Sequence, residues 1–379
     1  MKFTDCIEIV GSKPTLYEGT KQYVSTGAVE EYFINEKSIE EYSYKERPSR
    51  ADLVGKSGDI LFAKMAETKK TLILDKETEN YLFSTGFFAI RPKNGILTTK
   101  CLYYLLNSKN FLSQKDKNSS GATQKAITNA GLEKINVNIP LFSKQDQIVK
   151  QFDLLTDIIK KYQSQLKKLD SLIKSRFIEM FGDKPVESGK WKVEKLEDVC
   201  DLITDGTHKT PNYQQKGIRF ISAKNIINGK IDLTDTKFIT EEEYKQIQKR
   251  CRVEKNDVLL TKSGSLGSSA IIDFDIPIGL FESLAVIKYK RNLLNGIFVK
   301  ELLSAESSQK QFNNGVKGIA IKHLHLNVIA ALKIPIPPIE LQNDFASFVQ
   351  QIDKSKFTVQ KSLEKAETLY KSLMQEYFA

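Results

Sequence analysis

Small polar and basic residues gather in short clusters that recur in the two halves of the chain. The clearest cluster is the turn Asp205-Gly206-Thr207-His208-Lys209-Thr210-Pro211, which is rich in hydroxyl, imidazole and amine groups. Lysine and hydroxyl side chains contact phosphates, whereas asparagine and glutamine can hydrogen-bond the edge of adenine in the major groove. These residue types therefore predict a surface that binds DNA.

Further clusters of hydroxyl, amide and lysine side chains follow, and they have counterparts in the other half of the chain. Lys64 matches Lys262, and Lys125 matches Lys322. We interpret the run 220–226 as a strand that delivers three of the polar side chains. For a single residue, turn chemistry or surface charge is the simpler explanation, so the repetition carries the hypothesis. The predicted DNA-binding residues are Ser25, Thr26, Lys64, Gln124, Lys125, Thr207, His208, Lys209, Ser222, Lys224, Asn225, Lys262, Ser263, Lys322 and His323.

No residue pattern in the chain predicts catalysis. The phosphate-binding pattern G-x-x-x-x-G-K-[ST] is absent, and so is the Asn/Asp-Pro-Pro-aromatic tetrapeptide of adenine methyltransferases. His323 and His325 could face one way on a strand, but His208 is the only other histidine. Because a zinc site needs four ligands, or three and a water molecule, we expect no metal site. Because the catalytic motifs are absent, we also expect no catalytic residue.

The charge balance favours a polyanionic partner. The formal net charge is +10 at pH 7, and nucleic acid is the simplest partner for such a chain. An ordinary lysine-rich protein is the alternative explanation of the charge alone. The four cysteines are scattered, which is typical of reduced thiols in a cytoplasmic protein. No apolar run is long enough for a signal peptide or a membrane-spanning helix.

The chain that carries these clusters repeats itself at a nearly constant spacing. Pro140 recurs as Pro337, and Gln145 recurs as Gln342. The repeat predicts a tandem duplication of residues 1–181 and 182–379. A Gly-Asp-Lys-Pro sequence begins the second copy and predicts a helix stop followed by a short linker.

Each half ends in a heptad pattern of apolar residues, at steps that alternate between four and three. This pattern is typical of a helix that packs along its length against another helix. Arg176 and Lys356 are its polar members. The predicted residues of this heptad seam are Ile148, Phe152, Leu155, Ile159, Tyr162, Leu166, Leu169, Ile173, Phe345, Val349, Ile352, Val359, Leu363, Tyr370 and Leu373.

The heptad seam needs a partner, because each buried apolar side chain contributes about 1.5–3 kcal/mol. Each helix would be about 54 Å long. The other copy in the same chain could cover the seam, and so could a second chain. We favour the first arrangement, an antiparallel pair about a pseudo-twofold axis.

The residues before each helix form a mixed, strand-rich pattern. Short apolar runs bounded by turn residues predict strands at Ile60–Ala63, Thr71–Leu74, Phe87–Ile90, Val258–Thr261, Ala270–Ile272 and Ala285–Tyr289. Short helices are expected at Thr99–Leu106 and Phe298–Leu303. The predicted fold is α+β, a tandem-duplicated pseudo-twofold protein with two globular strand-rich domains separated by two long antiparallel coiled-coil helices. The predicted domains are 1–140, 141–181, 182–337 and 338–379.

Taken together, these motifs resemble the specificity subunit of Type I restriction-modification systems over essentially the whole chain. The second half carries the closer likeness, and the first half has Val10-Gly11-Ser12-Lys13-Pro14 in place of the Asp-Gly-Thr-His turn. The motifs that carry the resemblance are Trp191, Lys195–Val199, the turn at 205–211, Arg219–Ile226 with Gly229, Asn256–Gly264 and Ile334–Gln342.

The resemblance implies a division of labour among subunits. Residues 1–140 and 182–337 would be target-recognition domains, each reading one half of a split DNA sequence, with the paired helices setting the unread spacer. The implied partners are double-stranded DNA, two methylation subunits and two motor-nuclease restriction subunits. S-adenosylmethionine, ATP and Mg²⁺ would bind to the partners, with no cofactor in this chain, and the chain would itself catalyse nothing.

Two other functions compete with this one. A fused methyltransferase and restriction enzyme would need catalytic motifs that the sequence lacks. A coiled-coil interaction protein without a DNA role would satisfy the heptad seam but would leave the repeated basic clusters unexplained.

Overall fold

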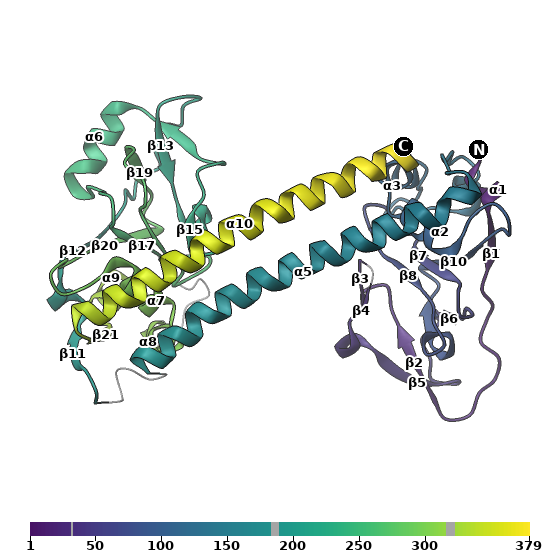
Figure 1. The fold of residues 1–379 in the computed structure, drawn as a ribbon, viewed down its shortest axis with the longest axis horizontal. Coiled ribbons are helices and arrows are strands. Elements are labelled where there is room, and N and C mark those ends of the chain that lie inside the picture. The colour runs from purple at the N-terminus through teal and green to yellow at the C-terminus, as the bar shows by residue number, and fades with distance from the viewer. Residues whose placement is uncertain (32, 183–188, 316–322) are drawn as a thin grey trace. The chain divides into compact units, whose positions relative to one another are not determined.

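The computed structural model describes residues 1–31, 33–182, 189–315 and 323–379, so most of the predicted linker at 182–189 lies outside the described residues. The chain divides into two compact units. The first unit is Met1–Gln163 with Gln360–Ala379, and the second unit is Ser164–Val359. Each unit combines one globular half with parts of two 40-residue helices, α5 (Phe142–Phe181) and α10 (Ile339–Phe378), drawn in teal and yellow in Figure 1.

The globular part of the first unit is a succession of short strands followed by short helices. Its elements in chain order are α1 (Phe3–Cys6), β1 (Ile7–Val10), β2 (Thr20–Val24), β3 (Val29–Glu30), β4 (Phe33–Ile34), β5 (Glu40–Ser43), β6 (Ala51–Leu53), β7 (Ile60–Ala63), β8 (Thr71–Ile73), β9 (Leu82–Ser84), β10 (Phe87–Pro92), α2 (Thr99–Leu106), α3 (Lys109–Lys117) and α4 (Asn129–Leu132).

The globular part of the second unit repeats this plan, with α6 inserted between β16 and β17 and with the strand pair β11 and β21 added. Its elements are β11 (Lys192–Lys195), β12 (Cys200–Asp205), β13 (Ile218–Ile221), β14 (Ile226–Ile227), β15 (Lys230–Ile231), β16 (Lys237–Ile239), α6 (Glu241–Arg250), β17 (Val258–Thr261), β18 (Ser269–Ile271), β19 (Ile278–Leu280), β20 (Leu284–Tyr289), α7 (Gly296–Ser304), α8 (Glu306–Gly315), α9 (Leu326–Ala330) and β21 (Lys333–Ile336).

The two units share the topology of their main sheet. A four-stranded antiparallel sheet has the order β1-β10-β7-β8 in the first unit and β12-β20-β17-β18 in the second. A second sheet in each unit contains one parallel pair, β2 with β9 and β13 with β19. The repetition confirms the predicted tandem duplication and the α+β class.

Both faces of the four-stranded sheet are covered, which explains the uniformly apolar central strands. In β7, Ile60 and Phe62 point toward helices α2 and α3, while Leu61 and Ala63 point toward the second sheet. The predicted strand positions and the helix at Thr99–Leu106 are confirmed, and α7 extends the predicted Phe298–Leu303 helix at both ends.

A buried glutamine fixes the first turn of each long helix to its globular half. Gln145 Oε1 accepts from Thr98 N–H at 2.8 Å, and its amide donates to Ile96 O at 2.8 Å and Pro140 O at 3.1 Å. Gln342 makes the same three bonds at the equivalent positions, at 2.9, 3.0 and 2.8 Å, with Asn295, Leu293 and Pro337. Both glutamines are fully buried. The two halves therefore repeat a specific hydrogen-bonding device as well as a topology.

In the first unit, the start of α5 packs against the end of α10. The Phe152 ring lies 5.4 Å from the Tyr370 ring and 5.9 Å from the Phe378 ring, measured between centroids. Ile148 and Met374 belong to the same core. These contacts join residues far apart in sequence, in antiparallel order.

In the second unit, the end of α5 packs against the start of α10. The ring of Phe345 lies 5.6 Å from Phe177 and 5.5 Å from Phe181. The polar seam residue Lys356 is satisfied by an ion pair with Asp170, at 2.5 Å. Within each unit, the intrachain antiparallel pairing that the heptad pattern favoured is therefore what the chain forms.

The heptad seam shifts by one residue at the end of each helix. Phe177 is buried in place of the predicted Arg176, whose guanidinium lies over the Phe348 ring at 5.8 Å. At the equivalent end of α10, Met374 and Phe378 are buried, while Leu373 is only half-buried. An α-helix has 3.6 residues per turn and drifts by about 20° per heptad, so a strict 3.5-residue pattern misplaces its last turns.

Candidate nucleic-acid interface

Three stretches of the second unit meet around the turn that joins β19 to β20. Thr207 N–H donates to Leu280 O at 2.9 Å, and Glu282 N–H donates back to Thr207 O at 3.0 Å. Lys262 N–H donates to Ser283 O at 2.8 Å. The same lysine accepts at its carbonyl from Leu324 N–H at 2.8 Å, which brings the segment after residue 322 to this place. The structure thus gathers predicted site residues from three separate stretches of sequence.

A buried carboxylate organises the side chains of this cluster. Asp205 is 2 % exposed, and Lys262, which donates to its Oδ2, is 3 % exposed. Arg250 Nη2 donates to Asp205 Oδ1 at 2.6 Å. His208 Nε2 lies 3.3 Å from the same oxygen, and His208 Nδ1 lies 2.6 Å from Glu282 Oε2. One carboxylate therefore holds two cations and approaches an imidazole.

Burial and nearby charges shift the pKa values of two residues in this cluster, Asp205 and His323. Burial alone would raise the pKa of the Asp205 carboxyl, but the hydrogen bond and charge of Lys262, with Arg250 and His208, bring that pKa below its usual value. The pKa of His323 is lowered by burial and by the charges of Lys262 and His325. Asp205 is therefore ionised at neutral pH, while the environment of His323 favours a neutral ring.

Lys262 has a role that differs from the prediction that it contacts DNA. Its ammonium group is buried in the ion pair with Asp205, so its charge is neutralised inside the domain. The exposed rim of the cluster is formed by Arg250 and His208, whose side chains are 55 % and 51 % exposed. Arg250 and His208 are therefore the solvent-facing donors of the cluster, and Lys262 fixes the Asp205 carboxylate that both of them contact.

The predicted strand at 220–226 is wrong beyond Ile221, where β13 ends. Residues Ala223–Asn225 form a 3₁₀ turn, in which the Asn225 side chain accepts from Ser222 N–H at 3.0 Å. The Asn225 amide also donates to Asp232 O at 3.1 Å and to Asp235 O at 3.0 Å, and the residue is 3 % exposed. A side chain that bonds its own backbone in this way favours a turn over a strand. Asn225 shapes the loop, while Lys224 beside it is exposed.

The first unit holds Lys64 at the place of Lys262. Lys64 N–H donates to Gly86 O at 2.8 Å, and Lys64 O accepts from Ile127 N–H at 2.8 Å, as at the matching positions of the second unit. Its side chain differs: Nζ donates to Thr85 O at 2.9 Å and lies 4.5 Å from the centre of the Phe88 ring. Burial lowers the pKa of Lys64. The predicted equivalence of the two lysines therefore holds for the backbone only.

Other predicted residues of the first unit bond to groups of nearby loops. Ser25 Oγ accepts from Ala28 N–H at 3.2 Å, and the carbonyl of Thr26 accepts from Lys70 Nζ at 2.7 Å. Ala66 N–H donates to Lys125 O at 2.9 Å, which brings the loop with Gln124 beside the strand end. Gln124 and Lys125 are exposed, and Ser25 and Thr26 are half-buried.

The remaining predicted residues differ in exposure. Lys209 is exposed, whereas Thr207, Ser222, Ser263 and His323 are half-buried. The predicted residue Lys322 lies outside the described part of the chain, so its position is not assigned.

Several residues of these clusters were not predicted from sequence. Asp205 stands in the quoted turn, but an acidic residue was not expected to organise a DNA-binding surface. Arg250 lies at the end of a polar helix, and no motif marks it. In the first unit, Lys115 is 2 % exposed and donates to Met65 O at 2.9 Å and Thr68 O at 2.7 Å, which holds the loop after Lys64. Arg250 and Lys115 each lie in the last turn of a helix that is basic there. This pattern was the one feature of the sequence that could have pointed to them.

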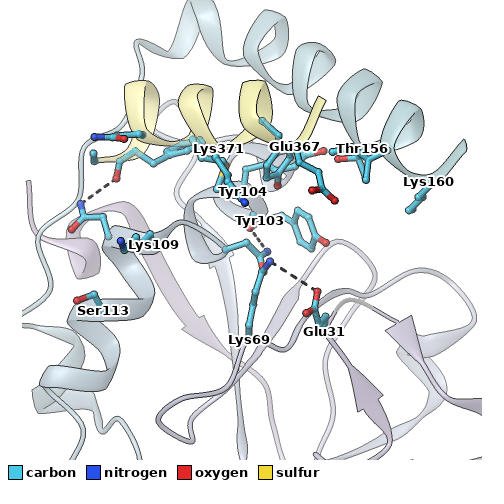
Figure 2. A pocket seen from close by; sticks show the side chains of 18 of the residues that line it. Glu31, Lys69, Tyr103, Tyr104, Lys109, Ser113, Thr156, Lys160, Glu367 and Lys371 are labelled. Carbon is cyan, nitrogen blue, oxygen red and sulfur yellow. Dashed lines mark hydrogen bonds and ion pairs between the residues drawn. The ribbon is translucent and has the colours of Figure 1, made fainter. Parts of the chain in front are cut away.

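The first unit also has a groove between its globular part and its long helices. Figure 2 shows Lys69 and Glu31 on one wall, with Thr156 and Lys160 of α5 and Glu367 and Lys371 of α10 on the other. Its volume is about 990 Å³, and Lys69 pairs with Glu31 across 4.0 Å. None of the predicted DNA-binding residues lines it. The groove carries both signs of charge and is a feature distinct from the loop clusters.

The described residues contain neither a metal-binding group nor a helix that could cross a membrane. Within these residues, no group of three or more histidine, cysteine, aspartate or glutamate side chains could hold a metal ion. No described helix has the length and apolar character needed to cross a membrane.

Comparison with known proteins links both halves to one family. The family described as Type I restriction modification DNA specificity domain matches twice, at residues 8–168 and 188–367. The two matches cover both globular halves and much of both long helices, in agreement with the duplication seen in the fold.

Curated relatives carry names from the same class. The EcoBI specificity subunit of Escherichia coli is 25 % identical over 296 residues, which cover 71 % of this chain. The chain spans 62 % of the length of that relative. The MjaVIII specificity subunit of Methanocaldococcus jannaschii is 22 % identical over 340 residues, which cover 85 % of this chain and 79 % of that protein.

Solved structures show a similar fold. A chain from a structure of complex assembly in the type I R-M system matches with a TM-score of 0.59 and 18 % identity, covering 98 % of this chain and 97 % of that one. The type I restriction-modification S subunit from M. genitalium matches with a TM-score of 0.59 and 15 % identity, covering 100 % and 95 %. With the duplicated topology, the repeated loop clusters and two family matches in place, the chain belongs to the family of Type I restriction-modification DNA specificity proteins.

Proposed function

We propose that this chain recognises DNA within a Type I restriction-modification complex, and that each unit reads one half of a bipartite sequence. The observation that carries the proposal is the repetition of one fold, with loop clusters at equivalent strand ends, in a chain of the specificity family. A net charge of +10 favours contact with the phosphate backbone. Exposed hydroxyl, amide and cationic side chains on the loops supply groups that can reach base edges.

The chain acts without catalysing a reaction in this proposal. Two methylation subunits dock on it and supply S-adenosylmethionine binding and adenine methylation, and two motor-nuclease subunits join to cleave unmodified DNA with ATP and Mg²⁺. The lack of P-loop and methyltransferase motifs in the sequence supports this division. The names of the curated relatives, which are specificity subunits of restriction enzymes, support it as well.

The long helices set the unread spacer between the two half-sequences. A helix of 40 residues is about 60 Å long. Half-sites one helical turn of DNA apart are separated by roughly 35 Å. A helix pair of this length can therefore span such a spacer while its ends remain anchored by the buried glutamines Gln145 and Gln342.

Methylation-aware sequencing tests the proposal. A host that carries the gene with its methylation subunit should show a methylated bipartite motif with a fixed gap, and deletion of the gene should remove methylation from every copy. If methylation of such motifs persisted after deletion, the proposal would be wrong.

A further inference from the structure

The two ends of helix α6 are bonded to the loop that follows β12 and to the last residue of β12. Near its start, Glu243 Oε1 accepts from Asn212 N–H at 2.8 Å. At its last residue, Arg250 donates to Asp205 at 2.6 Å. Between these ends, Ile247 is buried against Phe220 in a small core. The helix therefore holds the Arg250 side chain in a fixed place beside the predicted DNA-binding turn.

The contacts of Arg250 orient its guanidinium while leaving it half in solvent. Its Nη2 donates to Asp205 Oδ1 at 2.6 Å and lies 3.3 Å from His208 Nε2. An arginine side chain has five N–H donors in a rigid fork. Arg250 is 55 % exposed, and Asp205 engages one N–H of its Nη2. The other Nη2 N–H and a neighbouring N–H of the fork form the edge that can meet two acceptors.

The carboxylate that holds Arg250 is itself held in place by a buried partner. Asp205 is itself paired with the buried Lys262, so its carboxylate is fixed by the domain interior. A cation that only neutralises phosphate needs no such orientation, because that interaction depends mainly on charge. A guanidinium that reads a base needs its plane held, because the fork must meet two acceptors at once.

We propose that Arg250 is a specificity-determining residue that reads a guanine, through O6 and N7, in the half-sequence bound by the second unit. This inference rests on the proposed function and adds a residue and a base to it. A bidentate contact of this kind discriminates against other bases by about ten- to a hundredfold.

The first unit lacks this device. The span between β5 and β7, which is fully described, contains β6 and no α-helix. By the register of the strand pairs, Val10 opposite Ala89 matches Thr204 opposite Val286, so Gly11 occupies the place of Asp205. Gly11 has a φ of +97° and no side chain to hold a cation. Arg250 should therefore affect only one of the two half-sequences.

The test compares methylated motifs in hosts that express the full chain with its methylation subunits. The variants are Arg250→Ala, Arg250→Lys and, as a control, Arg252→Ala, whose exposed side chain pairs with Glu254 at 3.2 Å. We expect Arg250→Ala and Arg250→Lys to reduce the preference for one G·C pair about ten- to a hundredfold. The other half-sequence and the Arg252→Ala motif should be unchanged.

The outcomes separate the inference from the proposed function. If Arg250→Lys kept the full wild-type preference, or if both variants lowered methylation equally at all single-base variants of the site, Arg250 would supply charge alone and the inference would be overturned. Absence of any bipartite methylation with the wild-type chain would instead overturn the proposed function, and the inference with it. Unfolding followed by the fluorescence of Trp191, the single tryptophan, shows whether each variant is folded.

Discussion

At the residue scale, the second unit depends on a buried pair of opposite charges. Asp205 and Lys262 are each almost fully buried, and both belong to loops that the proposed function places at the DNA. Removing one partner of a buried ion pair is costly, because the other charge is left without compensation in a medium of low polarity. Asp205 therefore stabilises the fold as well as orienting Arg250.

Asp205→Asn should destabilise the second unit by about 3–5 kcal/mol, because it leaves Lys262 buried and unpaired. Lys262→Met in the same chain should recover at least half of this loss by removing the stranded charge. Denaturant unfolding followed by Trp191 fluorescence measures both, since Trp191 lies in the second unit and donates to Phe181 O at 3.2 Å. A double variant no more stable than Asp205→Asn would show that the cost does not come from the unpaired lysine.

The stability of the second unit should also depend on acid pH through Asp205. Because the folded protein lowers the pKa of this carboxyl, its stabilising effect is complete above the unfolded value of about 3.9 and is lost as pH falls through the lower folded value. Melting temperatures of the wild type should therefore fall more steeply below about pH 4 than those of Asp205→Asn. Asp201→Asn, at an exposed position of the same strand, serves as the control. Parallel curves for wild type and Asp205→Asn would contradict the assignment.

Residue types indicated the chemistry of the site better than they indicated individual roles. The sequence brought attention to the turn at 205–211 and to Lys262, and the structure places them together. It did not reveal that Lys262 is buried or that Asn225 is used by its own loop, because burial and partner choice depend on contacts between segments distant in sequence. Arg250 was missed for the same reason.

At the element scale, the two glutamines Gln145 and Gln342 fix each globular half to the long helix that follows it. Each satisfies one N–H and two carbonyl groups at the point where a helix leaves its globular half. Their recurrence at equivalent positions was visible in the sequence as a repeated residue. The bonds themselves were not, because glutamine in a helix is ordinarily a surface residue.

Gln342→Met should lower the stability of the second unit by at least about 2 kcal/mol. Methionine is similar in size but leaves the Asn295 N–H and two carbonyl groups without partners in the interior, each at a cost of about 1–3 kcal/mol. Gln350→Met, at an exposed position of the same helix, should change stability by less than about 0.5 kcal/mol. The midpoint of denaturant unfolding measures both, and equal shifts would contradict the role of Gln342.

The heptad pattern shows how far a sequence period can be trusted. It located both long helices, and the predicted residues Phe152, Tyr370 and Phe345 take part in ring contacts between them. It failed in the last turns, where Phe177 and Met374 are buried one position beyond the predicted residues. The failure occurs at equivalent places in both helices, as the geometry of an undistorted α-helix requires.

At the scale of the whole molecule, the duplication agrees with the proposal that one chain reads a split sequence. The same hydrogen bonds tie each globular half to the start of the long helix that follows it. In the proposed function, the length of these helices sets the gap between the two half-sequences. The sequence predicted this plan from its repeat. The two halves differ in features such as α6 and the Asp205 cluster. We expect these differences to make the two half-sequences of DNA different.

Lengthening both helices by four residues, after Gln163 and after Val359, should lengthen the unread gap and leave both half-sequences intact. Four residues add about 6 Å of helix, which corresponds to fewer than two base pairs at roughly 3.4 Å each. Sequencing of methylated DNA from a host with the lengthened chain measures the gap. An unchanged gap would mean that the helices do not set it.

The most direct test of the central claim, that each unit reads one half-sequence independently, is an exchange of one recognition domain. Residues 1–140 are replaced by the equivalent segment of another specificity protein with a different target, and methylated motifs are sequenced in hosts that carry the methylation subunits. The account predicts a motif in which one half-sequence changes to that of the donor, while the other half-sequence stays as in the parent. A motif in which both half-sequences change, or neither does, would contradict it.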